Sequence, residues 1–102
     1  MAKEIYTMGS WQVKPGKEDE FASEWKEFAT RSIERQDGAT DARLLRDIIK
    51  NDRYATFGSW KSREHIEKWR ESPVFKRFME KAKELCVEMQ IRTYEVVVHV
   101  TK

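Results

Sequence analysis

The order in which hydrophobic periodicities change along the 102-residue chain is the strongest constraint on its fold. Residues 5–13 alternate as in a β-strand with both faces partly covered, and Pro15-Gly16 ends the alternation. Residues 17–36 instead place Phe21 and Trp25 at helical spacing on one apolar face. The chain therefore begins with a strand that is followed by a long amphipathic helix.

The second half of the chain repeats this change of period. Lys50-Asn51-Asp52 has the composition of a turn between two strands, which predicts an antiparallel hairpin. Ser62 can then cap one helix, and Ser72-Pro73 carries the start signal of another, because proline at the first helical position lacks only a donor that has no partner there. The expected strands of this half cover residues 40–49, 53–60 and 88–101.

The order strand, helix, strand, strand, helix, strand predicts a ferredoxin-like α+β fold, the split β-α-β-β-α-β arrangement. It has a four-stranded antiparallel sheet with its helices on one face. We expect residues 1–102 to form a single domain without an internal repeat, a low-complexity run or a linker. The uncovered sheet face needs an apolar partner, and a second copy of the same sheet is the simplest one, so a symmetric homodimer is expected.

Charge and composition argue against several classes of partner. Twenty basic and 18 acidic residues give a net charge of +2, and the two signs alternate instead of forming the basic face that nucleic acid requires. No apolar run has the length of a membrane span or resembles a signal sequence, which predicts a cytoplasmic protein. The single cysteine, Cys86, rules out an intrachain disulfide, and its place on an expected helix face with Ala82 and Met89 favours a buried structural thiol over a nucleophile.

Motifs for cofactors are missing from the sequence. The four glycines form no phosphate-binding loop. His65 and His99 belong to different elements and lack the spacing of metal ligands. We therefore expect neither a cofactor nor a protein-built metal site.

Several short segments, taken together and in order, match a known pattern. They are Gly38-Ala39, residues 42–47, Phe57-Gly58-Ser59-Trp60-Lys61-Ser62-Arg63-Glu64, Trp69-Arg70, Ser72-Pro73-Val74-Phe75 and residues 92–97. In these segments the chain resembles the antibiotic biosynthesis monooxygenase (ABM) domain family over nearly its whole length. The resemblance implies a dimeric α/β barrel in which two ferredoxin-like sheets meet, with a pocket between helices and sheet in each subunit.

The resemblance implies one of two known activities, or membership in a third group that has none assigned. Some members oxidise polycyclic phenols or quinol-type substrates with molecular oxygen and without a metal or flavin, others bind and degrade haem, and many have no assigned reaction. In the haem-degrading branch the pocket tryptophan falls on Trp69, the axial histidine on Met79 and a strand asparagine near Gly9. Since two of these three residues differ here, haem binding or degradation is the least expected activity.

An oxygenase without a cofactor needs a dry aromatic pocket in which flat rings stack against a planar substrate. For each candidate pocket residue, simple core packing is the alternative interpretation, and for Trp25 the packing of the first helix is preferred. The candidates for substrate binding are Trp11, Trp60, Trp69, Phe78 and Met79.

Such an enzyme also needs a base and a group that stabilises a phenolate or enolate. His65 is the candidate base, with a solvated surface histidine as the alternative. Tyr94 and Arg92 share one strand face and are candidates to stabilise an oxyanion, with packing and a surface ion pair as alternatives. The first hypothesis is thus a cofactor-independent monooxygenase acting on an aromatic polyketide or quinol-like molecule. The alternative is a non-catalytic, small-ligand-binding or stress-related dimeric barrel.

Overall fold

The computed structural model describes residues 4–102, which form four strands and three helices. In chain order these are β1 (Ile5–Val13), α1 (Glu18–Arg35), β2 (Ala39–Arg46), β3 (Arg53–Trp60), α2 (Arg63–Glu71), α3 (Pro73–Leu85) and β4 (Cys86–Glu95). The predicted α+β class and ferredoxin-like order of elements are confirmed. None of the three helices in this part of the chain is long and apolar enough to cross a membrane.

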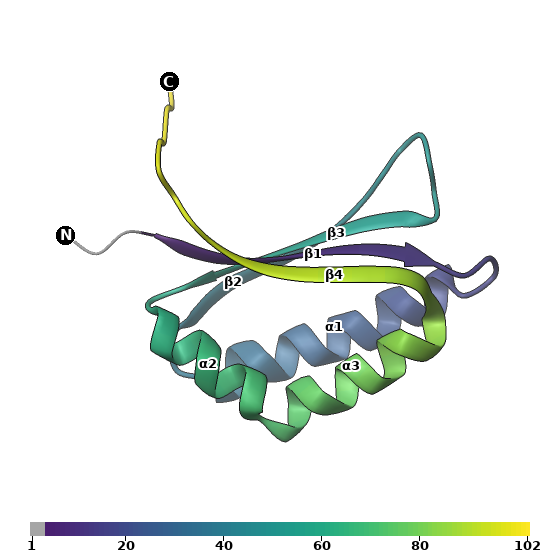
Figure 1. Ribbon diagram of the computed structural model, residues 1–102, viewed down its shortest axis with the longest axis horizontal. Coiled ribbons are helices and arrows are strands. Elements are labelled where there is room, and N and C mark those ends of the chain that lie inside the picture. The colour runs from purple at the N-terminus through teal and green to yellow at the C-terminus, as the bar shows by residue number, and fades with distance from the viewer. Residues whose placement is uncertain (1–3) are drawn as a thin grey trace.

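The four strands form one antiparallel sheet in the order β2-β3-β1-β4. All three helices lie against the same face of this sheet, and no described helix or strand covers the other face (Figure 1). Successive residues of a strand point to opposite faces. Each strand therefore contributes alternate side chains to a helix-covered face and to an open face.

The two helices of the second half begin where their sequence signals predicted. The Ser62 hydroxyl accepts a hydrogen bond from the backbone N–H of His65 at 3.3 Å. The Ser72 hydroxyl accepts one from the backbone N–H of Phe75 at 3.4 Å, and Pro73 is the first residue of α3. These caps satisfy N–H groups that have no partner within the helix, and they set the angle between α2 and α3 at Ser72.

The core lies between the helices and the covered face of the sheet and is rich in aromatic rings. Phe28 of α1 and Phe78 of α3 stack with their ring centroids 4.2 Å apart. Phe21 is completely buried and contacts the rings of Trp11 and Tyr54. Because aromatic pairs add to the free energy of burial, this cluster joins α1 and α3 to the two central strands.

The last strand differs from its prediction at both ends. β4 begins at Cys86, two residues earlier than expected, so Cys86 follows α3 and does not lie on its apolar face. The reason is that pairing with β1 continues to Val13 opposite Cys86, through an irregularity after Gln12. The thiol is buried as predicted, and this desolvation raises its pKa although Lys14 acts in the opposite direction.

Beyond Glu95 the expected strand does not continue. Residues 96–102 have no regular secondary structure, and Val97, Val98 and Val100 are largely exposed. One backbone hydrogen bond, from the Val96 N–H to the Glu4 carbonyl at 2.8 Å, is the last link to β1. The chain then leaves the sheet (Figure 1).

The second strand is also shorter than predicted and ends at Arg46 instead of residue 49. The cause is the Asp47 carboxylate, which accepts hydrogen bonds from the backbone N–H groups of Ile49 (2.8 Å) and Lys50 (3.0 Å). Such a bond to the chain two or three residues later folds the backbone into a turn. Ile48 and Ile49 are consequently exposed in the hairpin loop.

Candidate functional site

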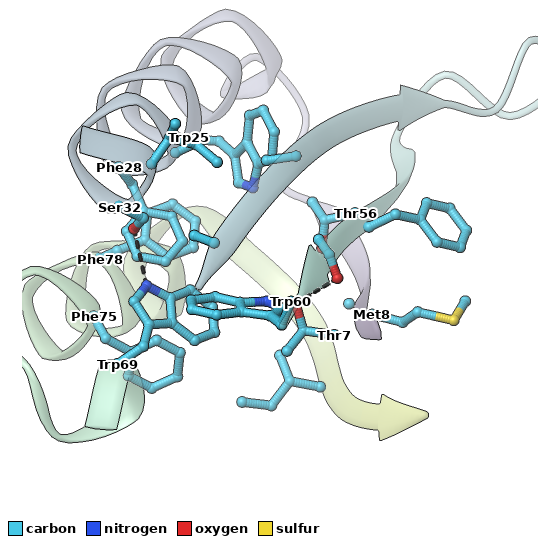
Figure 2. A pocket seen from close by; sticks show the side chains of 18 of the residues that line it. Thr7, Met8, Trp25, Phe28, Ser32, Thr56, Trp60, Trp69, Phe75 and Phe78 are labelled. Atoms are coloured by element: carbon cyan, nitrogen blue, oxygen red, sulfur yellow. Dashed lines mark hydrogen bonds between the residues drawn. The ribbon is translucent and has the colours of Figure 1, made fainter. Parts of the chain in front are cut away.

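A cavity of about 60 Å³ lies between the helices and the covered face of the sheet. A water molecule needs roughly 10–15 Å³ of such space, so the cavity has room for a ligand group or for several waters. Figure 2 shows Trp25 and Phe28 approaching it from α1, with Trp60 and Thr7 on the side of the sheet. Its side-chain walls are largely apolar and include Trp11, Trp25, Phe28, Ile33, Trp60, Trp69, Phe75, Phe78, Met79 and Ile91.

Trp69 of α2 forms one wall of the cavity and is held by several rings. Its ring centroid lies 4.9 Å from that of Trp60 and 4.8 Å from that of Phe75. It also stacks on Phe28 at 5.5 Å. These contacts come from three different elements, so the orientation of the Trp69 ring depends on the packing of the whole layer.

Each tryptophan that is buried at the cavity donates its indole N–H to a hydroxyl group in the cavity lining. The three hydrogen bonds run from Trp11 to Thr56 (3.0 Å), from Trp60 to Thr7 (3.1 Å) and from Trp69 to Ser32 (2.9 Å). The last of these is visible in Figure 2. A buried indole N–H without a partner would cost free energy, so these hydroxyls let large rings lie in the interior at fixed orientations.

Of the described residues that line the cavity, two are charged, Asp41 and Arg70, and Arg70 is the cation. Its Nε atom is buried, and among the residues that the structure describes it has no hydrogen-bond partner. Burial lowers the pKa of the Arg70 guanidinium, which nevertheless stays charged because arginine is not deprotonated in proteins. An unpaired N–H on a partly desolvated cation is suited to donate a hydrogen bond to the oxygen of an anionic ligand.

Arg70 also borders a second cleft, which has a volume of about 460 Å³. This cleft lies where α2 meets the ends of β1 and β4, and it includes Ile66, Thr93 and Tyr94. Arg70 therefore lies between the aromatic cavity and a more polar cleft. No separate sequence signal indicated Arg70, although Trp69-Arg70 was one of the segments that carried the family resemblance.

The five predicted substrate-binding residues come together in the structure. All of them line the aromatic cavity, from β1, β3, α2 and α3: Trp11, Trp60, Trp69, Phe78 and Met79. Trp25 and Phe28 line it as well, although the sequence assigned them to the packing of the first helix. An amphipathic face does not reveal where packing is incomplete, so the periodicity of α1 could not separate these two roles.

The three predicted catalytic residues do not come together at this cavity. His65 lies at the start of α2, where its Nδ1 is 2.6 Å from the Ser62 hydroxyl and its ring packs against Gly38. A side chain on Gly38 would collide with this ring, and Gly38 also has a positive φ of 92°. His65 is thus fixed beside the cavity wall and does not line it.

Arg92 and Tyr94 project from the open face of the sheet. In the pairing of β1 with β4, Arg92 lies opposite Met8 and Tyr94 lies opposite Tyr6. The odd-numbered residues of β1, such as Trp11, point to the helices. Met8 and Tyr6 are even-numbered, so they and their partners on β4 point away from the helices. Tyr94 reaches the second cleft beside Arg70 but not the aromatic cavity.

Potential metal ligands are not clustered in the described part of the chain. No group of three or more histidine, cysteine, aspartate or glutamate side chains is placed to hold an ion there. His99 lies in the irregular segment after β4, far along the sequence from His65 and outside the cavity lining.

The fold and the cavity together define a ferredoxin-like α+β protein with an aromatic pocket beneath its helices. The chain belongs to the antibiotic biosynthesis monooxygenase family, whose model matches residues 5–81. No curated protein matches the sequence.

Solved structures show the same fold at low sequence identity. SnoaB from Streptomyces nogalater, described as a cofactor-independent oxygenase, is 20% identical with a TM-score of 0.87, over 99% of this chain and 100% of its own. A conserved protein from Methanosarcina mazei Go1 is 22% identical with a TM-score of 0.83, over 90% and 91% of the two chains. PA3566 from Pseudomonas aeruginosa is 15% identical with a TM-score of 0.81, over 96% and 98%.

Proposed function

We propose that this chain is a cofactor-independent monooxygenase that oxidises an aromatic polyketide or quinol-like small molecule with O₂. The observation that carries the proposal is the buried, unpaired Nε of Arg70 at the edge of a cavity with aromatic walls. Membership in the ABM family supports it, as does the description of SnoaB as a cofactor-independent oxygenase.

The aromatic walls would bind and orient the substrate. Trp60, Trp69 and Phe78 offer ring faces and edges to a planar polycycle, and their apolar surface excludes water from the reacting carbon. Exclusion of water strengthens every electrostatic interaction inside the cavity. The Arg70 charge would therefore act on the bound substrate more strongly than it could in solvent.

Arg70 would stabilise the anion from which oxidation proceeds. Loss of a proton from an activated C–H or O–H group leaves an enolate or phenolate, and the guanidinium lowers the pKa of that group by pairing with its oxygen. The anion then passes an electron to O₂. Oxidation of a CH₂ group to C=O consumes one O₂. One oxygen atom enters the product, and the other leaves as water with the two hydrogens of the substrate. The substrate therefore supplies all the electrons.

Oxygen uptake without added cofactor tests this function. A panel of anthrones and hydroquinones would be compared in the wild type, Arg70→Met and Arg63→Met. Arg70→Met keeps an unbranched apolar stem but removes the guanidinium and its charge, and loss of one such stabilising group typically lowers kcat about 10²–10³-fold. Arg63 lies on the same helix in an exposed ion pair with Glu67, so its substitution is the matched control and should change little. Equal rates for Arg70→Met and the wild type would reject the role of Arg70.

His65 stays a proposed base and belongs in the same experiment. Because its ring lies outside the cavity lining, we expect His65→Ala to retain most of the activity, with a modest loss from the altered contact with Gly38. A loss as large as that of Arg70→Met, together with a changed pH profile, would assign proton abstraction to His65 instead.

We also propose a symmetric homodimer in which the open sheet faces of two copies meet. Leu45 and Tyr94 are each nearly half exposed, and Met8 and Phe57 lie between them on the same face. An apolar sheet face without a covering layer is typical of an interface. Sedimentation should give twice the chain mass of 12.2 kDa, and a monomer at micromolar concentration would contradict the proposal.

A non-catalytic role in ligand binding is the second candidate function. It is favoured by the position of His65 outside the cavity lining, since the candidate base does not face the pocket. In that case planar aromatic compounds would bind with no oxygen uptake above the buffer rate on any substrate of the panel.

A further inference from the structure

One five-residue pattern occurs twice in the chain. Residues 7–11 read Thr-Met-Gly-Ser-Trp, and residues 56–60 read Thr-Phe-Gly-Ser-Trp. Four of the five positions are identical. Both copies lie on the central strands of the sheet, the first on β1 and the second on β3.

The register of the sheet relates the two copies by an approximate twofold axis. Met8 pairs with Phe57 at the centre, Thr7 pairs with Gly58, and Gly9 pairs with Thr56. Each glycine therefore faces the threonine of the other copy. Since threonine, glycine and tryptophan are two residues apart, all three side-chain positions of each copy lie on the helix-covered face.

The glycines leave space in which the indole rings approach the neighbouring strand. A Cβ atom on Gly9 would lie 2.5 Å from both Trp11 Nε1 and Thr56 Oγ1. A Cβ atom on Gly58 would lie 2.8 Å from Thr7 Oγ1. Each tryptophan thus passes beside the glycine of its own strand and donates to the threonine of the other, and the two hydrogen bonds are 3.0 and 3.1 Å long.

The two threonines differ in whether the hydrogen of the side-chain hydroxyl has a hydrogen-bond acceptor. An indole N–H can only donate, so each hydroxyl accepts with its oxygen and keeps one hydrogen to donate. Thr7 directs this hydrogen to the Gly58 carbonyl at 3.5 Å. Thr56 makes no such donation to any of the residues in the described part of the chain, although it is buried and lines the aromatic cavity.

We propose that the Thr56 hydroxyl is the donor by which the cavity recognises a ketone or quinone carbonyl oxygen on a planar, otherwise apolar ligand. This inference rests on the proposed function and specifies its substrate class. The Trp11 N–H strengthens the donor, because a hydroxyl that accepts a hydrogen bond becomes a better donor itself. A hydrocarbon of the same shape would leave the buried hydroxyl hydrogen unpaired and would bind less well.

Fluorenone and fluorene are a matched pair of rigid tricyclic compounds that test this recognition. They differ in one carbonyl group, and equilibrium dialysis measures the binding of both. We expect the wild type to prefer fluorenone by about tenfold, the effect of one net hydrogen bond. In Thr56→Val the ratio of the affinities for fluorenone and fluorene should fall to about the ratio at which the two compounds partition into an apolar solvent. Thr56→Ser should keep the preference for fluorenone.

Thr7→Val is the control that the local symmetry provides. Both valine variants leave one indole N–H without an acceptor, so both should lower the urea midpoint by a similar amount. Only Thr56→Val should lose the preference for the ketone, because the Thr7 hydrogen already has an acceptor. An equal loss in both variants, or no loss in Thr56→Val, would overturn the proposal.

A measurement on the wild type keeps the test independent of how well the variants fold. The infrared carbonyl band of ¹³C-labelled fluorenone should move to lower wavenumber on binding, as it does when a carbonyl accepts a hydrogen bond, and an unshifted band would overturn the proposal. Ketone preference without oxygen uptake would contradict the monooxygenase alone, whereas uptake without ketone preference would contradict this inference alone. Binding of neither compound would contradict both.

Discussion

The two faces of the central strands show how one sequence can serve two purposes. On β1 and β3, Trp11 and Trp60 point to the helices and are buried, while Met8 and Phe57, each three residues earlier on the same strand, point to the open face. Both faces carry large apolar side chains. What differs is the covering layer: three helices enclose one face and create a cavity, and nothing in residues 4–102 covers the other.

Polar groups also differ between the two faces. On the covered face, the indole N–H of each buried tryptophan has a hydroxyl partner at 3.1 Å or less. On the open face, Arg43 pairs with Asp41 at 3.2 Å, but both side chains are more than half exposed, so this ion pair adds little to stability. The covered face is therefore specified by directional contacts, and the open face is adaptable enough to accept a partner.

The largest expected effect is on the covered face. Trp69→Ala removes a ring that contacts Trp60 and Phe75 and leaves a cavity, so it should lower the free energy of unfolding by about 3–5 kcal/mol. Urea unfolding followed by circular dichroism measures this. Ile49→Ala, in the exposed hairpin loop, is the control and should stay within about 0.5 kcal/mol of the wild type. A small effect of Trp69→Ala would mean that the ring contributes little to the stability of the core.

A charge on the open face should separate assembly from folding. Phe57→Glu places a carboxylate at the centre of the proposed dimer interface, twice because of the symmetry, and should weaken the dimer about 100-fold or more, roughly 2.7 kcal/mol. Sedimentation equilibrium would detect the monomer. Lys76→Glu, on the exposed side of α3, adds negative charge elsewhere and should leave the dimer intact. Unchanged assembly of Phe57→Glu would place the interface on another surface.

Neighbouring small residues on the two faces offer a finer comparison. Gly9→Ala directs a methyl group against Trp11 Nε1 and Thr56 Oγ1, and overpacking of this kind costs about 1–3 kcal/mol. Ser10→Ala, one residue later and on the open face, should change the free energy of unfolding by less than about 0.5 kcal/mol. Thermal unfolding of the two variants under the same conditions would show the contrast. Equal stability would indicate that β1 shifts to accept the methyl group.

The smallest expected effect lies outside both faces, at the hairpin loop. Backbone hydrogen bonds from Lys50 and Ile49 lower the pKa of the Asp47 carboxyl below its ordinary value of 3.8. A carboxyl whose pKa is lower in the folded state stabilises the fold above pH 3.8, and this contribution disappears as the pH falls through the folded-state pKa. NMR titration of the Asp47 carboxyl should therefore give a midpoint below 3.8. In Asp47→Asn the difference in urea midpoint from the wild type should be seen at pH 6 and vanish near pH 2.

Local signals predicted the elements of the fold. Alternation predicted β1 and β3, helical spacing predicted α1, and the caps at Ser62 and Ser72 placed the starts of α2 and α3. These features depend on residues close together in the sequence. The ends of β2 and β4 were wrong because they depend on a side-chain turn at Asp47 and on pairing with β1, which alternation does not encode.

The candidate site was predicted only in part, because it also depends on contacts between segments that are distant in the sequence. Trp11, Trp60 and Trp69 were selected as large aromatic residues on apolar faces, and the cavity brings them together. Arg92 and Tyr94 were correctly placed on one common strand face, but the side of the sheet to which that face belongs was not predictable from β4 alone. Arg70 was missed because an arginine next to a tryptophan on a helix gives no sign of being buried.

The sequence by itself determined the order of strands and helices, the faces that must be apolar and the family. The first two follow from the spacing of residue types, which is a local property, and the family follows from the set of short segments that resemble it. Only the tertiary structure decided which sheet face the helices cover, that the Nε of Arg70 is buried without a partner, and that the two Thr-x-Gly-Ser-Trp segments exchange hydrogen bonds across β1 and β3. The physical reason is that burial and hydrogen bonding between distant segments depend on the register and packing of the whole sheet, and no single segment contains that information.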